Sequence, residues 1–523
     1  MHPFRRPVEA RNIINNPSAA ELREMARREE ITTEYGSASY VTKVRNRSAK
    51  QTFIVDDALK LGVDQQGIAL EKADAIARAV HQYLRDRDLI RLDRQMGQHR
   101  DFCLHCRLYI TRDYARIPLQ WHNMLFEPKN RDDEPDLVSI YVPEWPERII
   151  FCHPVAGVTY ILGTDYFGEC KKSFLRKAMY RVKQQGCLGF HAGSKVLRVL
   201  DSHGGLKEVG FILFGLSGTG KTTLTMHDHG LTGKEGVAIR QDDVVMMHPS
   251  GYCYGTENGF YIKTEGLDES QRVLYQAAVS PNAIFENIYV DDKGRIRFDN
   301  SAYTANGRGV ILRSEVPGTD DQIDLDRVHR IIFITRRDDV VPAVARLNPE
   351  QAAAYFMLGE SIETSAGDPT KAGQPKRVVG TNPFLVGPEA EEGNRLLDML
   401  QTNPEIECYL LNTGSVGKRN GHPGIKITVR DSTQIMAQLA YGNIRWIQDP
   451  DWNYLVPVEI PGINVRTLDP RQYYSREEYA RRVAQLREER RAWLAKYPSL
   501  KPEIVRAIEP PRPLATAASA GAR

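Results

Sequence analysis

The sequence predicts a mixed α/β fold built from two large domains. The chain has 523 residues, more than a single hydrophobic core usually organises. From residue 196 onward, short apolar segments are separated by Gly and Asp, and this pattern is typical of buried strands. A Gly-rich turn at residues 215–223 follows one such strand and opens a helix. We therefore expect an N-terminal domain over residues 1–190 and a second domain over residues 191–500, with the boundary near residues 187–200.

The N-terminal domain is expected to contain two helices and several strands. Ser18 can cap a helix over residues 19–30, and residues 69–90 are rich in helix formers. Loop and strand are expected between these helices, over residues 36–55. Strand-like segments follow at residues 102–110, 137–142 and 148–152, and a charged, Pro-containing loop at residues 127–135 interrupts them.

The second domain is expected to end in a helix and a tail. Ser475 and Glu478 have the spacing of a capping box. Apolar residues then recur at helical spacing, at Tyr479, Val483, Leu486 and Trp493. Beyond residue 500 the chain becomes rich in Pro and Ala, so residues 501–523 are expected to be a disordered tail.

Charge and composition narrow the class of protein. Lys and Arg number 70 against 67 acidic residues, and the basic residues are spread along the chain, which disfavours nucleic acid as a partner. Residues 1–30 lack the apolar segment of a signal peptide, and no later stretch is apolar enough to span a membrane. The seven cysteines have irregular spacing, which does not suggest a disulfide framework. These features predict a soluble cytoplasmic protein.

One cysteine pair, Cys103 and Cys106, has a spacing used by zinc and redox sites. It has no second pair in the sequence and lies within the strand-like alternation of residues 102–110. Metal or redox chemistry is therefore disfavoured there.

Residues 215–222 match the phosphate-loop pattern G-x-x-x-x-G-K-[ST] and directly follow the apolar strand 209–214. Glycines let the backbone turn its N–H groups toward one anion, and the following helix adds the positive end of its dipole. A nucleoside triphosphate is the expected ligand, with Lys221 reaching its β and γ phosphates and the Thr222 hydroxyl holding magnesium. The expected nucleotide-binding residues here are Gly215, Leu216, Ser217, Gly218, Thr219, Gly220, Lys221, Thr222 and Thr223.

Three further segments could face the γ phosphate. Asp242 and Asp243 end a short strand, where carboxylates can hold a metal beside a phosphate loop. His191 lies among small residues, and Lys171 and Lys172 follow Gly-Glu-Cys. Taken singly, these groups also fit a polar turn, a structural histidine and surface lysines.

Taken in order, the segments resemble the ATP-type phosphoenolpyruvate carboxykinases. The order is Arg-Ser-x-Lys, Tyr-x-Gly-Glu-x-Lys-Lys, a His among small residues, the phosphate loop, Asp-Asp, Glu-Asn and an Arg. Residues 166–308 carry most of the resemblance, and residues 47–442 carry a weaker one. The loop composition points toward ATP. The resemblance implies a two-domain fold with the active site in a cleft between the domains, and the gluconeogenic conversion of oxaloacetate and ATP to phosphoenolpyruvate, ADP and carbon dioxide.

The resemblance also implies residue roles. Manganese would be held by Lys172, His191 and Asp243, and magnesium would travel with ATP. A lysine ligates only as the neutral amine, which requires a lowered pKa, and Lys171 could supply the necessary positive charge. The substrate would be held by Arg47, Tyr166, Lys172 and Arg308, and the catalytic residues would be Lys172, Arg308, Lys221 and Asp242. Nucleotide contacts beyond the loop would come from Glu286, Arg308, Lys426, Ile427 and Ser432.

Several segments depart from the family pattern, and two of them bear on function. Residues 335–341 read Thr-Arg-Arg-Asp-Asp-Val-Val, where the family usually has Thr-Ala-Asp-Ala-Phe-Gly-Val. Lys426 stands where the family has an arginine, and lysine cannot stack or fork as arginine does. These differences leave two alternatives open: a related phosphate-loop kinase acting on another carboxylic acid or on a protein, and a nucleotide-binding regulatory subunit without catalysis.

Overall fold

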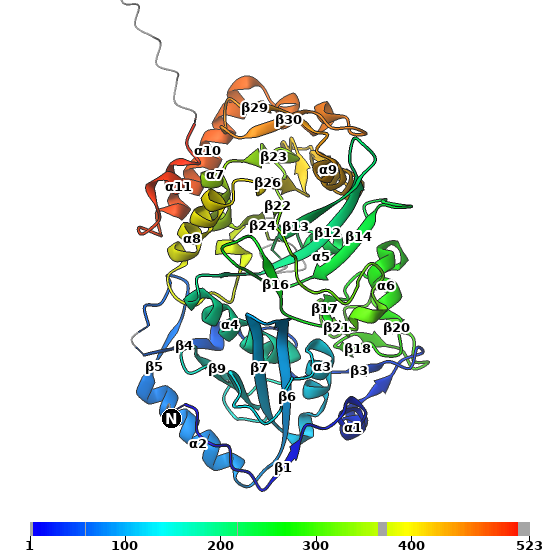
Figure 1. Cartoon of the computed structure of the whole chain (residues 1–523), viewed down its shortest axis with the longest axis vertical. Helices are drawn as coiled ribbons and strands as arrows, with labels where there is room; N and C mark the ends of the chain where they lie inside the picture. Colours follow the sequence, from blue (N-terminus) through cyan, green and yellow to red (C-terminus); the bar gives the residue numbers. More distant parts are fainter. Residues whose placement is uncertain (1–3, 58, 217, 364–373, 511–523) are drawn as a thin grey trace, which may run out of the picture.

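The computed structural model describes residues 4–57, 59–216, 218–363 and 374–510 (Figure 1). Two eight-stranded sheets dominate it. In Figure 1 the first sheet, drawn in blue and cyan, lies below the second, drawn in green to orange. Helices cover both sheets, so the mixed α/β class predicted from the sequence is confirmed.

The first sheet has the strand order β1-β6-β7-β8-β10-β9-β4-β5 and is buried on both faces. Alternate residues of one strand enter opposite cores: Phe151 packs toward α2 (Leu70–Leu84), and Ile150 packs toward α3 (Arg116–Met124) and α4 (Phe167–Gln184). The strands are β1 (Asn12–Asn15), β4 (Thr52–Asp56), β5 (Gly67–Ala69), β6 (Asp88–His99), β7 (Phe102–Thr111), β8 (Leu137–Val142), β9 (Ile149–His153) and β10 (Val158–Leu162).

The second sheet has the order β14-β12-β13-β22-β26-β23-β30-β29. Its strands are β12 (Ala192–Leu200), β13 (Leu206–Phe214), β14 (Gly236–Gln241), β22 (Arg330–Thr335), β23 (Val344–Leu347), β26 (Glu407–Asn412), β29 (Arg445–Gln448) and β30 (Leu455–Glu459). The neighbours β13, β22 and β26 run parallel, so their carboxyl ends meet at one edge. Ligands of α/β sheets commonly bind at such an edge.

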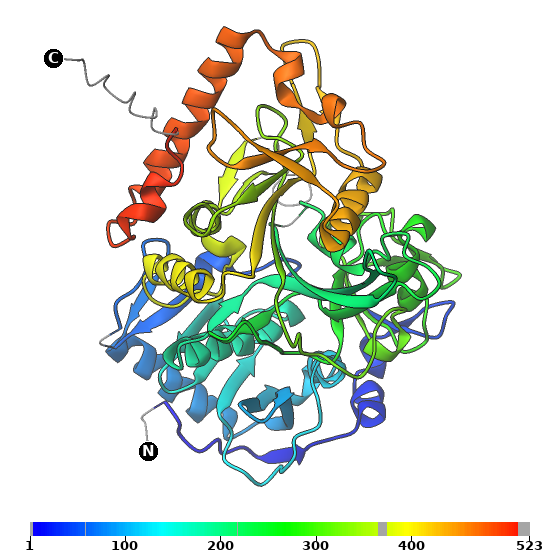
Figure 2. The ribbon, with the colours of Figure 1, turned by 45° about the horizontal axis from the view of Figure 1, so that its top comes forward.

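Helices cover the two faces of the second sheet. On one face lie α5 (Lys221–Met226) and α9 (Val429–Tyr441). On the other lie α7 (Pro349–Leu358), α8 (Glu389–Thr402), α10 (Arg476–Leu494) and α11 (Pro502–Arg506). Figure 2 shows α10 and α11, in orange and red, along one side of the molecule.

A five-stranded sheet joins distant parts of the chain. It pairs β2 (Ile31–Thr32) and β3 (Ala38–Tyr40) with β17 (Phe260–Lys263), β18 (Ile284–Glu286) and β21 (Arg308–Ile311). Two further helices are α1 (Ala19–Met25) and α6 (Arg272–Ala278). The division at residue 190 stays a prediction, and this sheet contains strands from both sides of it. One small sheet has three strands: β11 (Leu188–Phe190), β15 (Val245–Met247) and β16 (Cys253–Gly255). The two-stranded sheets pair β19 (Tyr289–Val290) with β20 (Ile296–Arg297), β24 (Glu360–Ile362) with β25 (Pro375–Arg377), and β27 (Ser415–Val416) with β28 (Ile425–Lys426).

Most predicted elements are present, with shifted ends. The strands expected at 102–110, 137–142, 148–152 and 209–214 correspond to β7, β8, β9 and β13. The helix expected to end at residue 90 ends at Leu84, because residues from Asp88 onward pair in β6. The helix expected over 19–30 ends at Met25 and is followed by a short 3-10 turn, and Ser18 caps it with a full capping box.

The C-terminal region is more ordered than expected. Ser475 caps α10 by accepting a hydrogen bond from the Glu478 N–H. Tyr479, Val483 and Leu486 are buried, as their spacing predicted. Pro502–Arg506 forms α11 with Ile504 buried, in place of the disordered tail expected from residue 501; residues 511–523 lie outside the described residues. None of the helices described here is long and apolar enough to span a membrane.

Candidate active site

The phosphate loop connects β13 with α5 at the carboxyl edge of the second sheet. The strand ends at Phe214 and the helix begins at Lys221. Gly218 and Gly220 have φ angles of 81° and 93°, a region that residues with a Cβ atom rarely adopt. The glycine pattern that predicted the loop is therefore required by its backbone. Ser217, one of the predicted nucleotide contacts, lies outside the described residues.

Side chains inside the loop hold its shape. The Thr219 hydroxyl donates to the Leu216 carbonyl at 2.8 Å, and a Cβ atom at Gly215 would lie 2.4 Å from the Thr219 Oγ1. Thr413, which follows β26, donates its hydroxyl to the Thr219 carbonyl at 2.6 Å. Thr222 and Thr223 are partly exposed on the first turn of α5.

Lys221 points from the loop toward the end of β14. Its Nζ lies 3.6 Å from Oδ1 of Asp243 and 3.4 Å from Nε2 of His191. Burial lowers the pKa of Lys221, and the nearby Asp243 carboxylate opposes this effect. Three of the predicted site residues therefore converge on one point beside the phosphate loop.

His191 lies between β11 and β12 and is oriented by a backbone carbonyl. Its Nδ1 donates to the Thr381 carbonyl at 2.7 Å, which leaves Nε2 as the lone-pair nitrogen of a neutral ring. Burial lowers the pKa of His191 below its ordinary value, with a further contribution from Lys221. The Nε2 faces Oδ1 of Asp243 at 3.0 Å. Two acceptors that face each other in this way form a suitable position for a cation.

Lys172 lies on the first half of α4 and has a strongly altered pKa. Burial lowers this pKa well below its ordinary value, and the charges of Arg47 and Arg308 lower it further. No hydrogen bond or ion pair joins its ammonium group to any other residue that the structure describes. The environment of Lys172 thus shifts its equilibrium toward the neutral amine, the form that a metal ligand requires.

Lys171 does not have the role expected of it. Its Nζ forms ion pairs with Asp243 at 2.8 Å and with Glu257 at 2.6 Å, and the side chain is 1% exposed. It therefore neutralises carboxylates, and the charges that lower the Lys172 pKa come from Arg47 and Arg308 instead. The expectation for Lys171 was wrong, because the two neighbouring side chains leave α4 in different directions.

The adjacent carboxylates of Asp242 and Asp243 differ in acidity. Burial raises the pKa of Asp242 to about 6. Burial acts in the same direction on Asp243, but the charge of Lys171, together with that of Lys221, outweighs it and holds its pKa well below the ordinary value. Asp243 is thus the permanent anion of the site, and Asp242 is a group that can change its charge near neutral pH.

The predicted substrate arginines retain unused donors. The Arg47 guanidinium lies over the Phe384 ring, 5.6 Å from its centre, and that of Arg308 lies 5.5 Å from the ring centre of Tyr261. Among the described residues, the buried Nε atoms of Arg47 and Arg308 have no hydrogen-bond partner. Buried donors without partners are rare and suggest that a ligand completes the site.

Asn306 joins two of the predicted substrate residues. It accepts a hydrogen bond from Arg308 at 2.8 Å and donates one to the Tyr166 hydroxyl at 3.3 Å. Tyr166 is fully buried and precedes the first residue of α4. The start of α4 and the start of β21 are therefore fixed relative to each other at this site.

The remaining predicted nucleotide residues lie on two parts of the chain: Glu286 pairs with Arg308 across β18 and β21, and the others lie on or after β28. Glu286 is fully buried and accepts a hydrogen bond from the Phe167 N–H at the start of α4, and burial raises its pKa to about 7. Lys426 is exposed at the end of β28, and Ile427 lies in the core. The Ser432 hydroxyl donates to the Thr428 carbonyl. No hydrogen bond among the described residues joins these side chains to the phosphate loop, so their nucleotide contacts stay predictions.

Cys103 and Cys106 lie on β7, as the alternation predicted. Three positions apart on a strand, they point to opposite faces: Cys106 is buried and Cys103 is partly exposed. They cannot share a metal ion in this arrangement.

Comparison with known proteins identifies the family of the chain. The sequence model of the phosphoenolpyruvate carboxykinase family matches residues 11–466. The chain belongs to this family. It is 35% identical to the ATP-type phosphoenolpyruvate carboxykinase of Aeropyrum pernix over 394 residues, which cover 75% of this chain and 78% of the relative. It is 28% identical to that of Parvibaculum lavamentivorans over 458 residues, covering 82% and 81%. It is 27% identical to that of Rhizobium rhizogenes over 481 residues, covering 86% and 85%.

The match to the carboxykinase family includes every predicted site residue and ends before α10 and α11. Sequence reasoning missed Glu257 and Asn306, which contact the predicted residues directly. A weak signal existed for each. Glu257 begins the segment Glu-Asn-Gly-Phe-Tyr-Ile-Lys, where the family usually has Glu-Gly-Gly-Cys-Tyr-Ala-Lys, and Asn306 precedes Gly307-Arg308.

Proposed function

We propose that this carboxykinase converts oxaloacetate and ATP to phosphoenolpyruvate, ADP and carbon dioxide. The observation that carries the proposal is the meeting of His191, Asp243 and Lys221 beside the phosphate loop. Phosphoryl transfer and loss of carbon dioxide both develop negative charge, and this site places cationic groups and a cation-binding pair together.

Manganese fits the residues at this site. Lys172, His191 and Asp243 would hold it, because the lowered pKa of Lys172 shifts its equilibrium toward the neutral amine and the His191 Nε2 presents its lone pair toward Asp243. The described residues contain no cluster of three or more His, Cys, Asp or Glu side chains that could hold a metal, and this proposal takes the third protein ligand from the Lys172 amine. When bound, the metal supplies positive charge beside the oxygen that becomes negative as carbon dioxide leaves.

ATP and magnesium would bind at the phosphate loop. The N–H groups around Gly218 and Gly220 and the start of α5 favour an anion. Lys221 would move from Asp243 toward the β and γ phosphates, and the partly exposed Thr222 hydroxyl would contact magnesium.

Arg47, Tyr166 and Arg308 would bind the dicarboxylate. The unpartnered Nε of each arginine supplies a donor for a carboxylate oxygen. Arg308 also lies beside Asn306 and Tyr166, where it could bridge the substrate and the γ phosphate. A cytoplasmic location and an active-site cleft that excludes water belong to this proposal.

The test is phosphoenolpyruvate formation from oxaloacetate, ATP and manganese. The unsubstituted enzyme should form it, while Lys172→Ala and Arg308→Ala should lose at least about a hundredfold in kcat/KM, the range for groups that act in the transition state. ATP consumption without phosphoenolpyruvate would favour the alternative of a kinase for another acid. Absence of any turnover with retained ATP binding would favour the regulatory subunit.

A further inference from the structure

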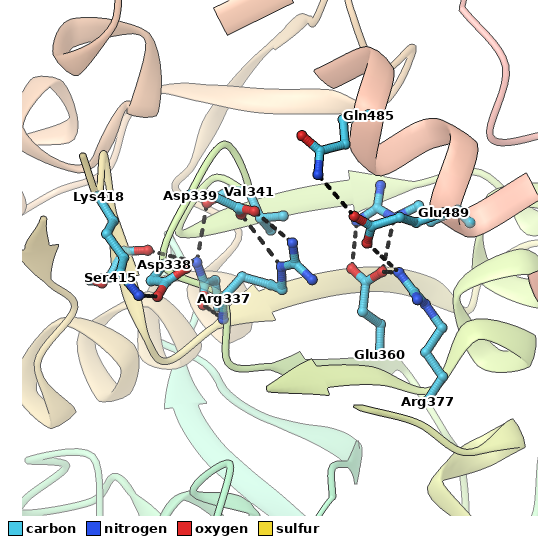
Figure 3. Close-up of polar contacts among 12 residues, drawn as sticks. Arg337, Asp338, Asp339, Val341, Glu360, Arg377, Ser415, Lys418, Gln485 and Glu489 are labelled. Atoms are coloured by element: carbon cyan, nitrogen blue, oxygen red, sulfur yellow. Dashed lines mark hydrogen bonds and ion pairs between the residues drawn. The ribbon is translucent and has the colours of Figure 1, made fainter. Parts of the chain in front are cut away.

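A buried group of charges lies beside the nucleotide site and reaches into α10. We call it the Glu360 cluster: Arg337, Asp339, Glu360, Arg377 and Arg490. Arg490 of α10 donates two hydrogen bonds to the Glu360 carboxylate, at 2.7 and 3.2 Å. Arg377 of β25 donates a third at 2.8 Å. Figure 3 shows Glu360 and Arg377 below Glu489 of α10, with Arg337 and Asp339 to their left.

Several contacts fix the position of the Arg490 guanidinium. Its side chain is 1% exposed, and its guanidinium lies over the rings of Tyr355 and Trp452, at 5.0 and 4.7 Å from their centres. It also donates to the Tyr355 hydroxyl at 2.9 Å. A planar, two-pronged pair of this kind fixes orientation as well as charge.

The cluster acts on Arg337 through charge. Burial would lower the pKa of Arg337, but Glu360 and Asp339 outweigh it and raise this pKa. Arg337 donates to Asp339 at 2.6 Å. Glu360 therefore stabilises the charged form of two arginines from different elements, Arg337 after β22 and Arg490 in α10.

The backbone of Arg337 is fixed at the same time. Its N–H donates to the Asn412 side chain at 2.9 Å, and its carbonyl accepts from the Ser415 N–H at 2.8 Å. A Cβ atom at Gly414 would lie 2.1 Å from this carbonyl oxygen, so the two segments are in close contact. The segment after β22 is held between β24 and the turn after β26.

Arg336 precedes Arg337 and lies at the phosphate loop. Its exposed side chain donates from Nη1 to the Gly218 carbonyl at 2.8 Å. A guanidinium carries five N–H donors, and no other hydrogen bond or ion pair joins this one to a residue that the structure describes. The Arg336 carbonyl accepts from the Ile362 N–H of β24, the strand that begins with Glu360.

We propose that Arg336 is a nucleotide-binding residue that contacts the phosphates of the bound nucleotide. Arg490 is a positioning residue that holds it at the loop through Glu360 and Arg337. Both assignments depend on the proposed function in one respect, namely that ATP is the nucleotide. Arg336 stands where the family pattern has alanine, and α10 lies beyond residue 466, where the family match ends. The C-terminal helix would thus be part of the nucleotide site.

The experiment measures binding of magnesium-ATP by titration calorimetry without oxaloacetate. Arg336→Ala should weaken binding about tenfold, the effect of losing one charge-assisted contact. Arg490→Met should weaken it by about three- to tenfold, and the double variant should bind no more weakly than Arg336→Ala alone. Arg491→Met is the matched control, because Arg491 pairs with Glu509 on the exposed face of α10 and should bind ATP normally.

Two results would overturn the proposal: unchanged ATP affinity in Arg336→Ala, or effects of the two substitutions that multiply in the double variant. Thermal melts check that each variant is folded. If Arg490→Met does not fold, Arg490→Lys replaces it, since lysine keeps the charge and loses the two-pronged pair. Because ATP binding is measured without turnover, the roles of Arg336 and Arg490 can be tested even if the carboxykinase assay fails.

Discussion

The Nε2 atom of His191 lies 3.0 Å from Oδ1 of Asp243, while Oδ2 of the same carboxylate accepts from Lys171 at 2.8 Å. One oxygen of Asp243 is thus neutralised by a lysine, and the other faces a lone pair. This difference between the two oxygens means that one buried carboxylate can be stable in the protein and keep an oxygen for the metal proposed above.

The first prediction concerns the stability of Lys172. The unfolded chain carries an ammonium group here at neutral pH, whereas folding lowers the pKa of this group and so disfavours its charged form. The lysine therefore lowers stability below its unfolded pKa, and this cost disappears as pH rises toward 10.5. With a chelator present, Lys172→Met should raise the free energy of unfolding by about 1–2 kcal/mol at pH 7, with a smaller gain at pH 10, as measured by denaturant titration.

The neighbouring lysine supplies the control. Lys171→Met leaves Asp243 and Glu257 without their shared cation in a buried position, so it should lower the free energy of unfolding by about 3–5 kcal/mol. Equal effects of the two substitutions would contradict the assignment of different roles to these lysines.

The second prediction separates substrate binding from nucleotide binding. Arg47→Ala should raise the KM for oxaloacetate at least about tenfold, since it removes a charge-assisted donor for a carboxylate. The affinity for ATP, measured by calorimetry, should stay unchanged. If turnover with oxaloacetate is unaffected, Arg47 is not a substrate residue.

The third prediction concerns Lys221. Lys221→Ala should reduce kcat by about a thousandfold or more, because the charge on the transferring phosphoryl group loses its cation. Rapid-quench measurement of ADP formation tests this directly. A variant that retains normal kcat would show that Lys221 only supports the Asp243 pair seen here.

The fourth prediction is a null effect at the cysteine pair. Cys103→Ser should change neither metal content nor stability by more than about 0.5 kcal/mol, as is usual away from packed or paired groups. Elemental analysis of the purified variant is the check. Loss of a bound metal would reverse our interpretation of this pair.

The fifth prediction follows from the lowered pKa of Glu360. Burial opposes this shift, and Arg490 and Arg337 outweigh it. The carboxylate therefore stabilises the fold fully above its ordinary pKa of 4.5 and loses this contribution as pH falls below that value. Glu360→Gln should cost about 3–5 kcal/mol at pH 7 and about 1 kcal/mol less at pH 4. A difference that does not change with pH would contradict the ion-pair assignment.

The sequence by itself determined the elements whose cause is local. The phosphate loop followed from its glycines, β7 and β8 from their alternation, and the cap of α1 from Ser18 and Glu21. The roles predicted for Lys172, His191 and Asp243 came from the order of motifs that the family shares. The match over residues 11–466 confirms the family, and the roles stay predictions.

Tertiary structure decided which charges face one another. No spacing in the sequence distinguishes Lys171, paired with Asp243, from Lys172, whose pKa is lowered by Arg47 and Arg308. Arg490 and Glu360 lie 130 residues apart and still form a buried pair. Local propensity acts over a few residues, whereas burial and Coulomb interactions depend on distance in space, and the packing of whole elements sets that distance.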